Sequence, residues 1–165
     1  MWSPDRRRLL AALAALPVAG CGFRPALGPG GPASGLFDRV AFAAPTDRNA
    51  FELVARLEDR LGRAGRGALY RLSYRIETEE TGLAITPSAA ITRYNVLGSV
   101  AFRVEDAAGA EVTAGRVRSF AAYSATGTPV STAAARTDAY RRLMTIFADQ
   151  IVTRLIATSA AWASP

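Results

Sequence analysis

The feature that most constrains the fold is a long run of alternating apolar and polar residues from Ile91 to Glu105. Successive side chains of a β-strand point to opposite faces, so this run predicts a strand with one buried face and one exposed face. Runs of the same kind cover residues 68–78 and 111–123, and a shorter one covers residues 36–42. The sequence therefore predicts four strands, of which the first is short.

Apolar residues recur at helical spacing in two further stretches. The first carries a stripe from Phe51 to Leu61 and follows Asp47, which suits the N-cap position, so we predict a helix from Asp47 to about Ala64. This helix lies between the first and second predicted strands.

The second helical stretch carries a stripe from Tyr140 to Leu155 and follows the last strand. Its expected N-cap is Ser131 or Thr132. The predicted order is β-α-β-β-β-α, an α+β fold in which two helices pack on one face of a four-stranded sheet.

Short polar segments between the strands predict the connections. We expect a turn around Glu80-Thr81-Gly82 and a hairpin turn at Asp106-Ala107-Ala108-Gly109. Gly115 lies inside a predicted strand, where an isolated glycine is typical of a β-bulge.

The N-terminal segment has the layout of a lipoprotein signal peptide. Three arginines at 6–8 precede an apolar stretch of ten residues, which as a helix covers about 15 Å, half the roughly 30 Å of membrane hydrocarbon. The stretch ends in Val18-Ala19-Gly20-Cys21, which fits the bacterial lipobox, so we expect Cys21 to carry the lipid. The alternative is a chance free cysteine after an ordinary signal or a short core helix.

This segment defines the expected domain organisation. We predict a cleaved signal peptide over residues 1–20, a lipidated and flexible tether rich in Gly and Pro over residues 21–35, and a single α+β domain over residues 36–160. Gly22 follows the cysteine, where Asp would retain many lipoproteins in the inner membrane. We therefore expect an outer-membrane protein that is anchored at Cys21 and faces the periplasm.

The chain contains no His and no Lys, and Cys21 is its one cysteine. These absences exclude Ser-His-Asp and Cys-His nucleophile systems, Schiff-base lysines, the P-loop lysine and an intrachain disulfide. The adjacent carboxylates Glu79-Glu80 and Glu105-Asp106 are the candidates left for acid–base work, and both pairs lie at predicted turns. We expect no enzymatic activity, no cofactor, no metal site and no nucleic-acid partner.

Six arginines are predicted to lie on the sheet face away from the helices, and the formal net charge of the chain is +6. Such a face would bind anions, because the planar guanidinium donates to phosphate in a bidentate way. The alternative is that glutamates on the same strands pair with them, as on an ordinary solvated sheet. The arginines are Arg71, Arg75, Arg93, Arg103, Arg116 and Arg118.

Several motifs of the sequence resemble a known family. The start Cys21-Gly22-Phe23-Arg24-Pro25, the tetrapeptide Thr92-Arg93-Tyr94-Asn95, the stretch 117–123 and the helix segment 148–155 are similar to those of LPS-assembly lipoproteins (LptE) of alphaproteobacteria. The chain departs from this family at Ala26-Leu27-Gly28, in the tether.

The resemblance implies a non-enzymatic lipoprotein that sits inside the LPS-assembly outer-membrane β-barrel (LptD), helps it fold and plugs it. It also implies binding of lipopolysaccharide through basic residues, foremost Arg93, which lies inside a matching motif, and then Arg116 and Arg118. Two alternatives stay open: an auxiliary lipoprotein of a periplasmic phospholipid-transport system, and a carboxylate-dependent periplasmic hydrolase.

Overall fold

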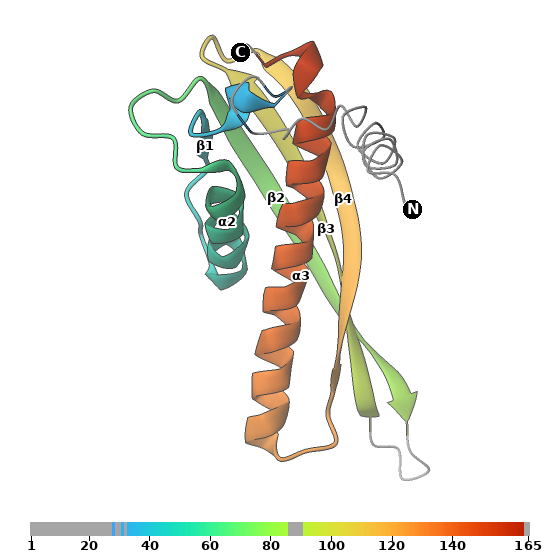
Figure 1. Ribbon diagram of the computed structural model, residues 1–165. Helices are drawn as coiled ribbons and strands as arrows, with labels where there is room; N and C mark the ends of the chain where they lie inside the picture. Colours follow the sequence, from blue (N-terminus) through green and yellow to red (C-terminus); the bar gives the residue numbers. More distant parts are fainter. Residues whose placement is uncertain (1–27, 29–30, 32, 86–90, 164–165) are drawn as a thin grey trace, which may run out of the picture.

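The computed structural model describes residues 28, 31, 33–85 and 91–163 (Figure 1). The predicted signal peptide, Cys21 and most of the predicted tether lie outside these residues. The helices and strands are η1 (Ser34–Leu36), β1 (Val40–Phe42), α2 (Arg48–Leu61), β2 (Tyr70–Ile85), β3 (Ile91–Asp106), β4 (Glu111–Ser124), α3 (Pro129–Thr158) and η2 (Ser159–Ala161).

The four strands form one sheet in the order β1-β2-β3-β4. β1 pairs in parallel with β2, and α2 makes the crossover that a parallel pair requires. β2, β3 and β4 pair antiparallel. Both α2 and α3 lie on the same face of this sheet (Figure 1). The predicted α+β class and element order are therefore confirmed.

The N-terminal part of the fold differs from the prediction in one respect. The strand predicted over residues 36–42 is formed only by Val40–Phe42, and a 3-10 helix over Ser34–Leu36 precedes it. Asp38 has a φ of 56°, in the left-handed region, which an extended strand cannot contain. The chain therefore bends at Asp38 before it enters the sheet.

Both helices begin at capping residues. The Asp47 carboxylate accepts from the Ala50 N–H at 2.9 Å, as predicted. α2 ends at Leu61 and not at about Ala64 as predicted, because Gly62, with a φ of 79°, ends the helix there. The cap predicted for α3 was wrong, because Thr128, and not Ser131 or Thr132, caps the helix and its side chain accepts from Ser131 N–H. Pro129 follows at the first helical position, where its missing N–H costs nothing.

The turn predicted around Glu80-Thr81-Gly82 was wrong. β2 continues to Ile85 because β3 pairs with it through this segment, with Thr81 opposite Asn95 and Gly82 opposite Tyr94. Thr81 and Gly82 are exposed, because this end of the hairpin extends beyond the buried part of the sheet. A strand can therefore have a polar sequence here.

The second predicted turn is confirmed. The Asp106 carboxylate accepts from the N–H groups of Ala108 and Ala110, both at 2.9 Å, and Gly109 supplies a φ of 81°. Glu105, however, is a strand residue and not a turn residue, because it pairs with Arg71 of β2.

Gly115 does not mark a bulge, which corrects the expectation from sequence. The pairing of β3 with β4 is regular around it, with Gly115 opposite Phe102. A Cβ atom at this position would lie 2.9 Å from both the Phe102 ring and Nη1 of Arg154. The glycine is therefore needed for a close approach of side chains.

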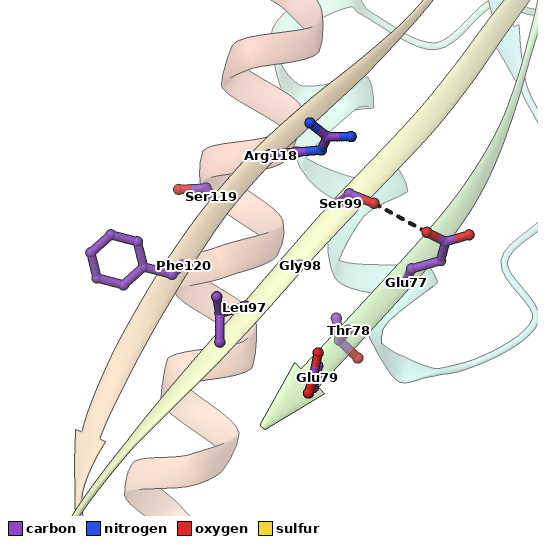
Figure 2. A pocket seen from close by; sticks show the side chains of 9 residues that line it. All are labelled: Glu77, Thr78, Glu79, Leu97, Gly98, Ser99, Arg118, Ser119 and Phe120. Carbon is purple, nitrogen blue, oxygen red and sulfur yellow. Dashed lines mark hydrogen bonds between the residues drawn. The ribbon is translucent and has the colours of Figure 1, made fainter. Parts of the chain in front are cut away.

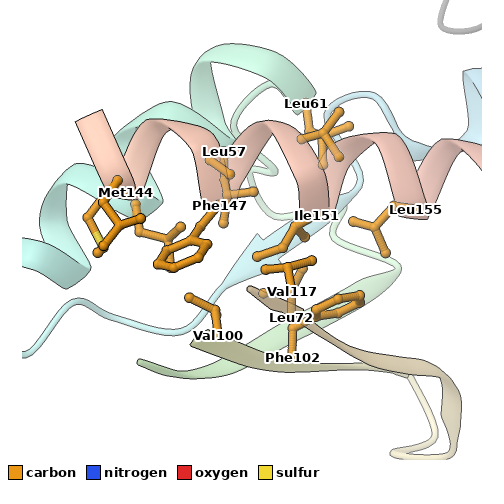
Figure 3. Packing of buried hydrophobic residues seen from close by; sticks show 14 of the residues in the cluster. Leu57, Leu61, Leu72, Val100, Phe102, Val117, Met144, Phe147, Ile151 and Leu155 are labelled. Carbon is orange, nitrogen blue, oxygen red and sulfur yellow. The ribbon is translucent and has the colours of Figure 1, made fainter. Parts of the chain in front are cut away.

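The core lies between α3, α2 and the inner face of the sheet (Figure 3). Phe147 is fully buried, and Val100 and Phe102 of β3 belong to the same cluster. Salt bridges join the two helices beside this core: Asp149 of α3 lies 3.2 Å from Arg56 and 2.7 Å from Arg60 of α2.

Replacing Phe147 by Ala should lower the free energy of unfolding by about 3–5 kcal/mol, since it leaves a cavity in the centre of the core. The matched control is Phe120→Ala on β4, where the ring is 60% exposed and the expected loss is below about 1 kcal/mol. Chemical denaturation of both variants measures the difference. Equal losses would contradict the placement of these two rings.

Candidate functional site

The six predicted arginines all lie on the outer face of the sheet, which is the face away from α2 and α3. Side chains alternate along each strand, and every one of these positions is exposed while its neighbours in sequence are partly or fully buried. The residues are Arg71 and Arg75 on β2, Arg93 and Arg103 on β3, and Arg116 and Arg118 on β4.

The register brings five of the six arginines together. Arg75 and Arg116 lie on either side of Ala101, in one row across three strands. Arg118 lies opposite Ser99 in the next row. We call the set Arg71, Arg75, Arg103, Arg116 and Arg118 the arginine surface.

Arg93 is not part of the arginine surface. The nearest member is Arg118, whose partner Ser99 lies six positions along β3 from Arg93, which is about 20 Å of strand. Arg93 instead lines a separate hollow of about 380 Å³ beside Ala122 and Ser124 of β4. The structure thus divides the predicted site residues into two places.

Two members of the arginine surface have carboxylate partners. Arg103 lies 2.8 Å from Glu111, and Arg116 lies 3.2 Å from Glu77. Glu77 also accepts from the Ser99 hydroxyl at 3.3 Å. These exposed pairs stabilise the fold little, because water screens them.

The remaining predicted arginines make no ion pair within the part of the chain that the structure describes. They are Arg71, Arg75, Arg93 and Arg118. Both interpretations drawn from the sequence therefore apply, each to different residues: Arg103 and Arg116 are paired across strands, and the other four can bind an external anion.

An apolar pair lies beside Arg118 on the same face. Leu97 of β3 and Phe120 of β4 are cross-strand neighbours, 45% and 60% exposed. Together with Glu77 and Glu79 of β2 they line a shallow hollow of about 620 Å³ (Figure 2). Apolar side chains adjoin a free guanidinium here, which is an arrangement that suits an amphiphilic anion.

Sequence reasoning missed this apolar pair. The sequence did contain an indication of it, because Phe120 is apolar at a position where the alternation of the strand predicts a polar residue. An apolar residue on the polar face of a strand is a candidate contact for a ligand or a partner.

The adjacent carboxylates do not form catalytic pairs. Glu79 and Glu80 are consecutive residues of a strand, so Glu79 points to the outer face and Glu80 to the face that α3 covers. Glu105 is a half-buried strand residue on the outer face, opposite Arg71, while Asp106 closes the hairpin turn. Neither pair brings two carboxylates to one point.

Glu80 instead forms a structural network with α3. Its carboxylate accepts from the Tyr123 hydroxyl at 2.7 Å, from Nε of Arg136 at 2.8 Å and from the Tyr140 hydroxyl at 3.3 Å. Tyr123 also stacks on Tyr94, with 5.1 Å between the ring centroids. These contacts hold the end of the sheet against the first turns of α3.

The network shifts the pKa of Glu80 and that of Tyr123. Burial raises the pKa of Glu80, but the hydrogen bonds from Tyr123, Arg136 and Tyr140 outweigh it, and the pKa lies below the ordinary value. A lowered pKa keeps the carboxyl ionised, which is the wrong direction for a general acid. Burial and the bond to Glu80 raise the pKa of Tyr123 to about 12.

Among the described residues, no group of three or more Cys, Asp or Glu side chains could hold a metal ion. None of the described helices is both long enough and apolar enough to span a membrane.

A family model described as "LptE: Lipopolysaccharide-assembly" matches residues 37–155, which is most of the chain. The chain belongs to the LptE family. Membership supports a role in lipopolysaccharide assembly, in association with the transport machinery, and it confirms the family predicted from sequence. An LptE fold points to an assembly role rather than to an enzyme. No curated protein matches the chain.

Solved structures share the fold. A lipoprotein from Caulobacter crescentus is 27% identical, with a TM-score of 0.66 over 81% of this chain and 99% of its own. The rare lipoprotein B from Shewanella oneidensis is 15% identical, with a TM-score of 0.54 over 73% of this chain and 93% of its own. Lipoprotein B from Nitrosomonas europaea is 18% identical, with a TM-score of 0.57 over 76% and 86%. The last two similarities concern the fold alone.

Replacing Glu80 by Gln should lower the free energy of unfolding at pH 7 by about 1–3 kcal/mol, because the hydrogen bonds then lose their charged acceptor. A lowered pKa stabilises the fold above the ordinary value of 4.5 and ceases to do so as the pH falls through the lowered value. The difference between wild type and variant should therefore shrink below pH 4.5 in denaturation experiments.

The control is Glu79→Gln, the same substitution one residue away on the outer face. It should change the stability by less than about 0.5 kcal/mol at any pH. A loss as large as that of Glu80→Gln, or a pH-independent loss in both, would contradict the assignment of the network.

Proposed function

We propose that the chain is an outer-membrane lipoprotein that binds lipopolysaccharide on the outer face of its sheet and serves as plug and assembly partner of the LPS-translocon β-barrel. The observation that carries this proposal is a sheet face that no described element covers, on which arginines without an ion pair to a described residue adjoin the exposed Leu97–Phe120 pair, in a member of the LptE family.

The chemistry of lipopolysaccharide matches this face. Its lipid A and core phosphates are polyanionic, and guanidinium groups bind phosphate oxygens with two parallel hydrogen bonds. Its acyl chains are apolar and would contact Leu97 and Phe120. Arg75 and Arg118 are the strongest candidates for the phosphate, because neither forms an ion pair within the described residues and both lie closer to the Leu97–Phe120 pair than Arg71, which is opposite Glu105.

Arg93 fits the proposal in a different way. Because about 20 Å of strand separates it from the arginine surface, one phosphate cannot contact both places. Arg93 would bind a second anionic group of a large amphiphile, or a group on the wall of the barrel.

The plug role agrees with the polarity of the outer face. The lumen of an outer-membrane barrel is polar, and a sheet face bearing Arg, Glu, Ser and Asn side chains presents hydrogen-bonding groups to such a wall. Lipidation at Cys21, which lies outside the described residues, would hold the domain at the membrane. Buried acyl chains contribute about 0.8 kcal/mol per CH₂, and several chains anchor a protein stably.

Replacing Arg75 and Arg118 together by Gln should weaken the binding of purified lipopolysaccharide to the full-length chain at least about tenfold, since each charge-assisted hydrogen bond contributes roughly 1.5–3 kcal/mol. The control is Arg48→Gln with Arg66→Gln, which removes the same charge away from the outer face. Titration with labelled lipopolysaccharide measures both, and equal weakening would show that net charge alone governs binding.

A mild-detergent pull-down of the full-length chain from its native membranes should recover a large outer-membrane β-barrel in a near one-to-one ratio, identified by mass spectrometry. The Cys21→Ser variant should leave the membrane fraction and recover much less of it. Recovery of an inner-membrane transporter would overturn the plug assignment in favour of an auxiliary role in phospholipid transport. Membrane retention of the Cys21→Ser variant would overturn the anchor.

A further inference from the structure

The last strand of the sheet, β4, has one open edge. Within the described residues β4 pairs with β3 alone, and it is 14 residues long. In an antiparallel pair the backbone groups of alternate residues point to the partner strand and those of the others point away. The N–H of Ala125 donates to Thr92 O, which places odd-numbered residues toward β3 and even-numbered residues toward the open edge.

Two arginines of α3 donate to carbonyl groups at this edge. Nη1 of Arg154 lies 3.0 Å from the carbonyl oxygen of Arg116, and Nη2 of Arg142 lies 3.0 Å from that of Ala122. Arg142 also pairs with Asp138 of its own helix. Each guanidinium thus occupies a backbone carbonyl oxygen that would otherwise accept a hydrogen bond from an added strand.

The spacing of these contacts follows from the geometry of the two elements. The twelve residues from Arg142 to Arg154 span about 18 Å of helix, and the six residues from Arg116 to Ala122 span about 20 Å of strand. α3 runs antiparallel to β4, so each arginine meets its own carbonyl. Gly115 supports the Arg154 contact, because a Cβ there would lie 2.9 Å from Nη1 of Arg154.

The backbone between the two contacts remains open. No hydrogen bond of the described residues reaches the edge-facing N–H and C=O groups of Arg118 and Phe120. Beside Arg118, α3 does not fill the space next to the edge, because a hollow of about 680 Å³ lies between β4 and α3, lined by Arg118 and Ile146 among others. An unpaired edge of this kind is a template for a further strand.

The open stretch is self-complementary. If a second β4 paired antiparallel about a two-fold axis at Ser119, Arg118 of each copy would lie opposite Phe120 of the other, and Arg116 opposite Ala122. Arginine against an aromatic ring is a favourable neighbour. Arg142 and Arg154 donate to the carbonyls of Ala122 and Arg116, which would pair with each other across this axis. The two arginines therefore block the hydrogen bonds at both ends of such a pairing.

We infer that the β4 edge is a strand-addition surface for a second copy of this chain, and that Arg142 and Arg154 keep it closed. This inference does not depend on lipopolysaccharide binding or on the barrel partner. It explains how an exposed edge strand can be kept from pairing with another copy: the side chains of Arg142 and Arg154 occupy two of its carbonyl acceptors without covering the strand.

The test compares variants of the full-length chain by sedimentation velocity in a density-matched detergent. Replacing Arg142 and Arg154 by Ala should strengthen dimerisation at least about tenfold over wild type, and hydrogen exchange at the amides of Arg118 and Phe120 should slow in the dimer. The variant with Met at both positions keeps the aliphatic stems, so it should dimerise equally even if the Ala variant folds poorly.

The control pair is Arg48→Ala with Arg66→Ala, which removes the same charge and should stay monomeric. A double variant that remains as monomeric as this control, or a wild-type chain that dimerises equally, would overturn the inference. So would unprotected amides at the edge of a dimer.

Two substitutions at one residue separate strand addition from simple apolar contact. In the background without the two arginines, Phe120→Pro removes an edge N–H and should restore the monomer, because proline cannot donate to an added strand. Phe120→Ser keeps that N–H and should leave the dimer in place. If Phe120→Ser also restores the monomer, the copies associate through the exposed ring and the inference is wrong.

Discussion

The burial of the apolar stripe of α3 against one face of an antiparallel sheet is the constraint on which the rest of the structure depends. Once Phe147 and its neighbours occupy the inner face, the two-residue period of each strand decides where every other side chain points. Apolar residues at even positions of β3 enter the core. The arginines at odd positions of β2 and β3 then face outward, and no further interaction is needed to place them there.

This dependence explains how much could be predicted from the sequence. Alternation and helical spacing were sufficient for the fold class, the element order and the face of all six outer arginines. The end of β2 was not predictable in this way, because Glu80-Thr81-Gly82 is polar enough for a turn and is held in a strand by pairing with β3. The same limit applies to Glu80, whose partners Arg136 and Tyr140 lie about sixty residues away.

Arginine serves several purposes in a chain that has no lysine. Arg103 and Arg116 balance glutamates across the sheet, Arg56 and Arg60 tie α2 to Asp149 of α3, and Arg142 and Arg154 reach backbone carbonyls. A guanidinium carries five donors in a planar fork, so one residue type can meet carboxylate, carbonyl and phosphate acceptors. The sequence revealed where the charges lie, but only the tertiary contacts distinguish those that are engaged from those left free.

The exposed Leu97–Phe120 pair is the strongest argument that the outer face has a partner. Burying a large apolar side chain contributes about 1.5–3 kcal/mol, and this fold forgoes part of that contribution at two adjacent positions. Polar residues there would serve a solvated sheet equally well and would keep the alternation of β4 intact. An apolar pair beside the free Arg118 becomes favourable when an amphiphile or a protein wall removes it from water. Under the proposed function, this face is therefore one half of an interface.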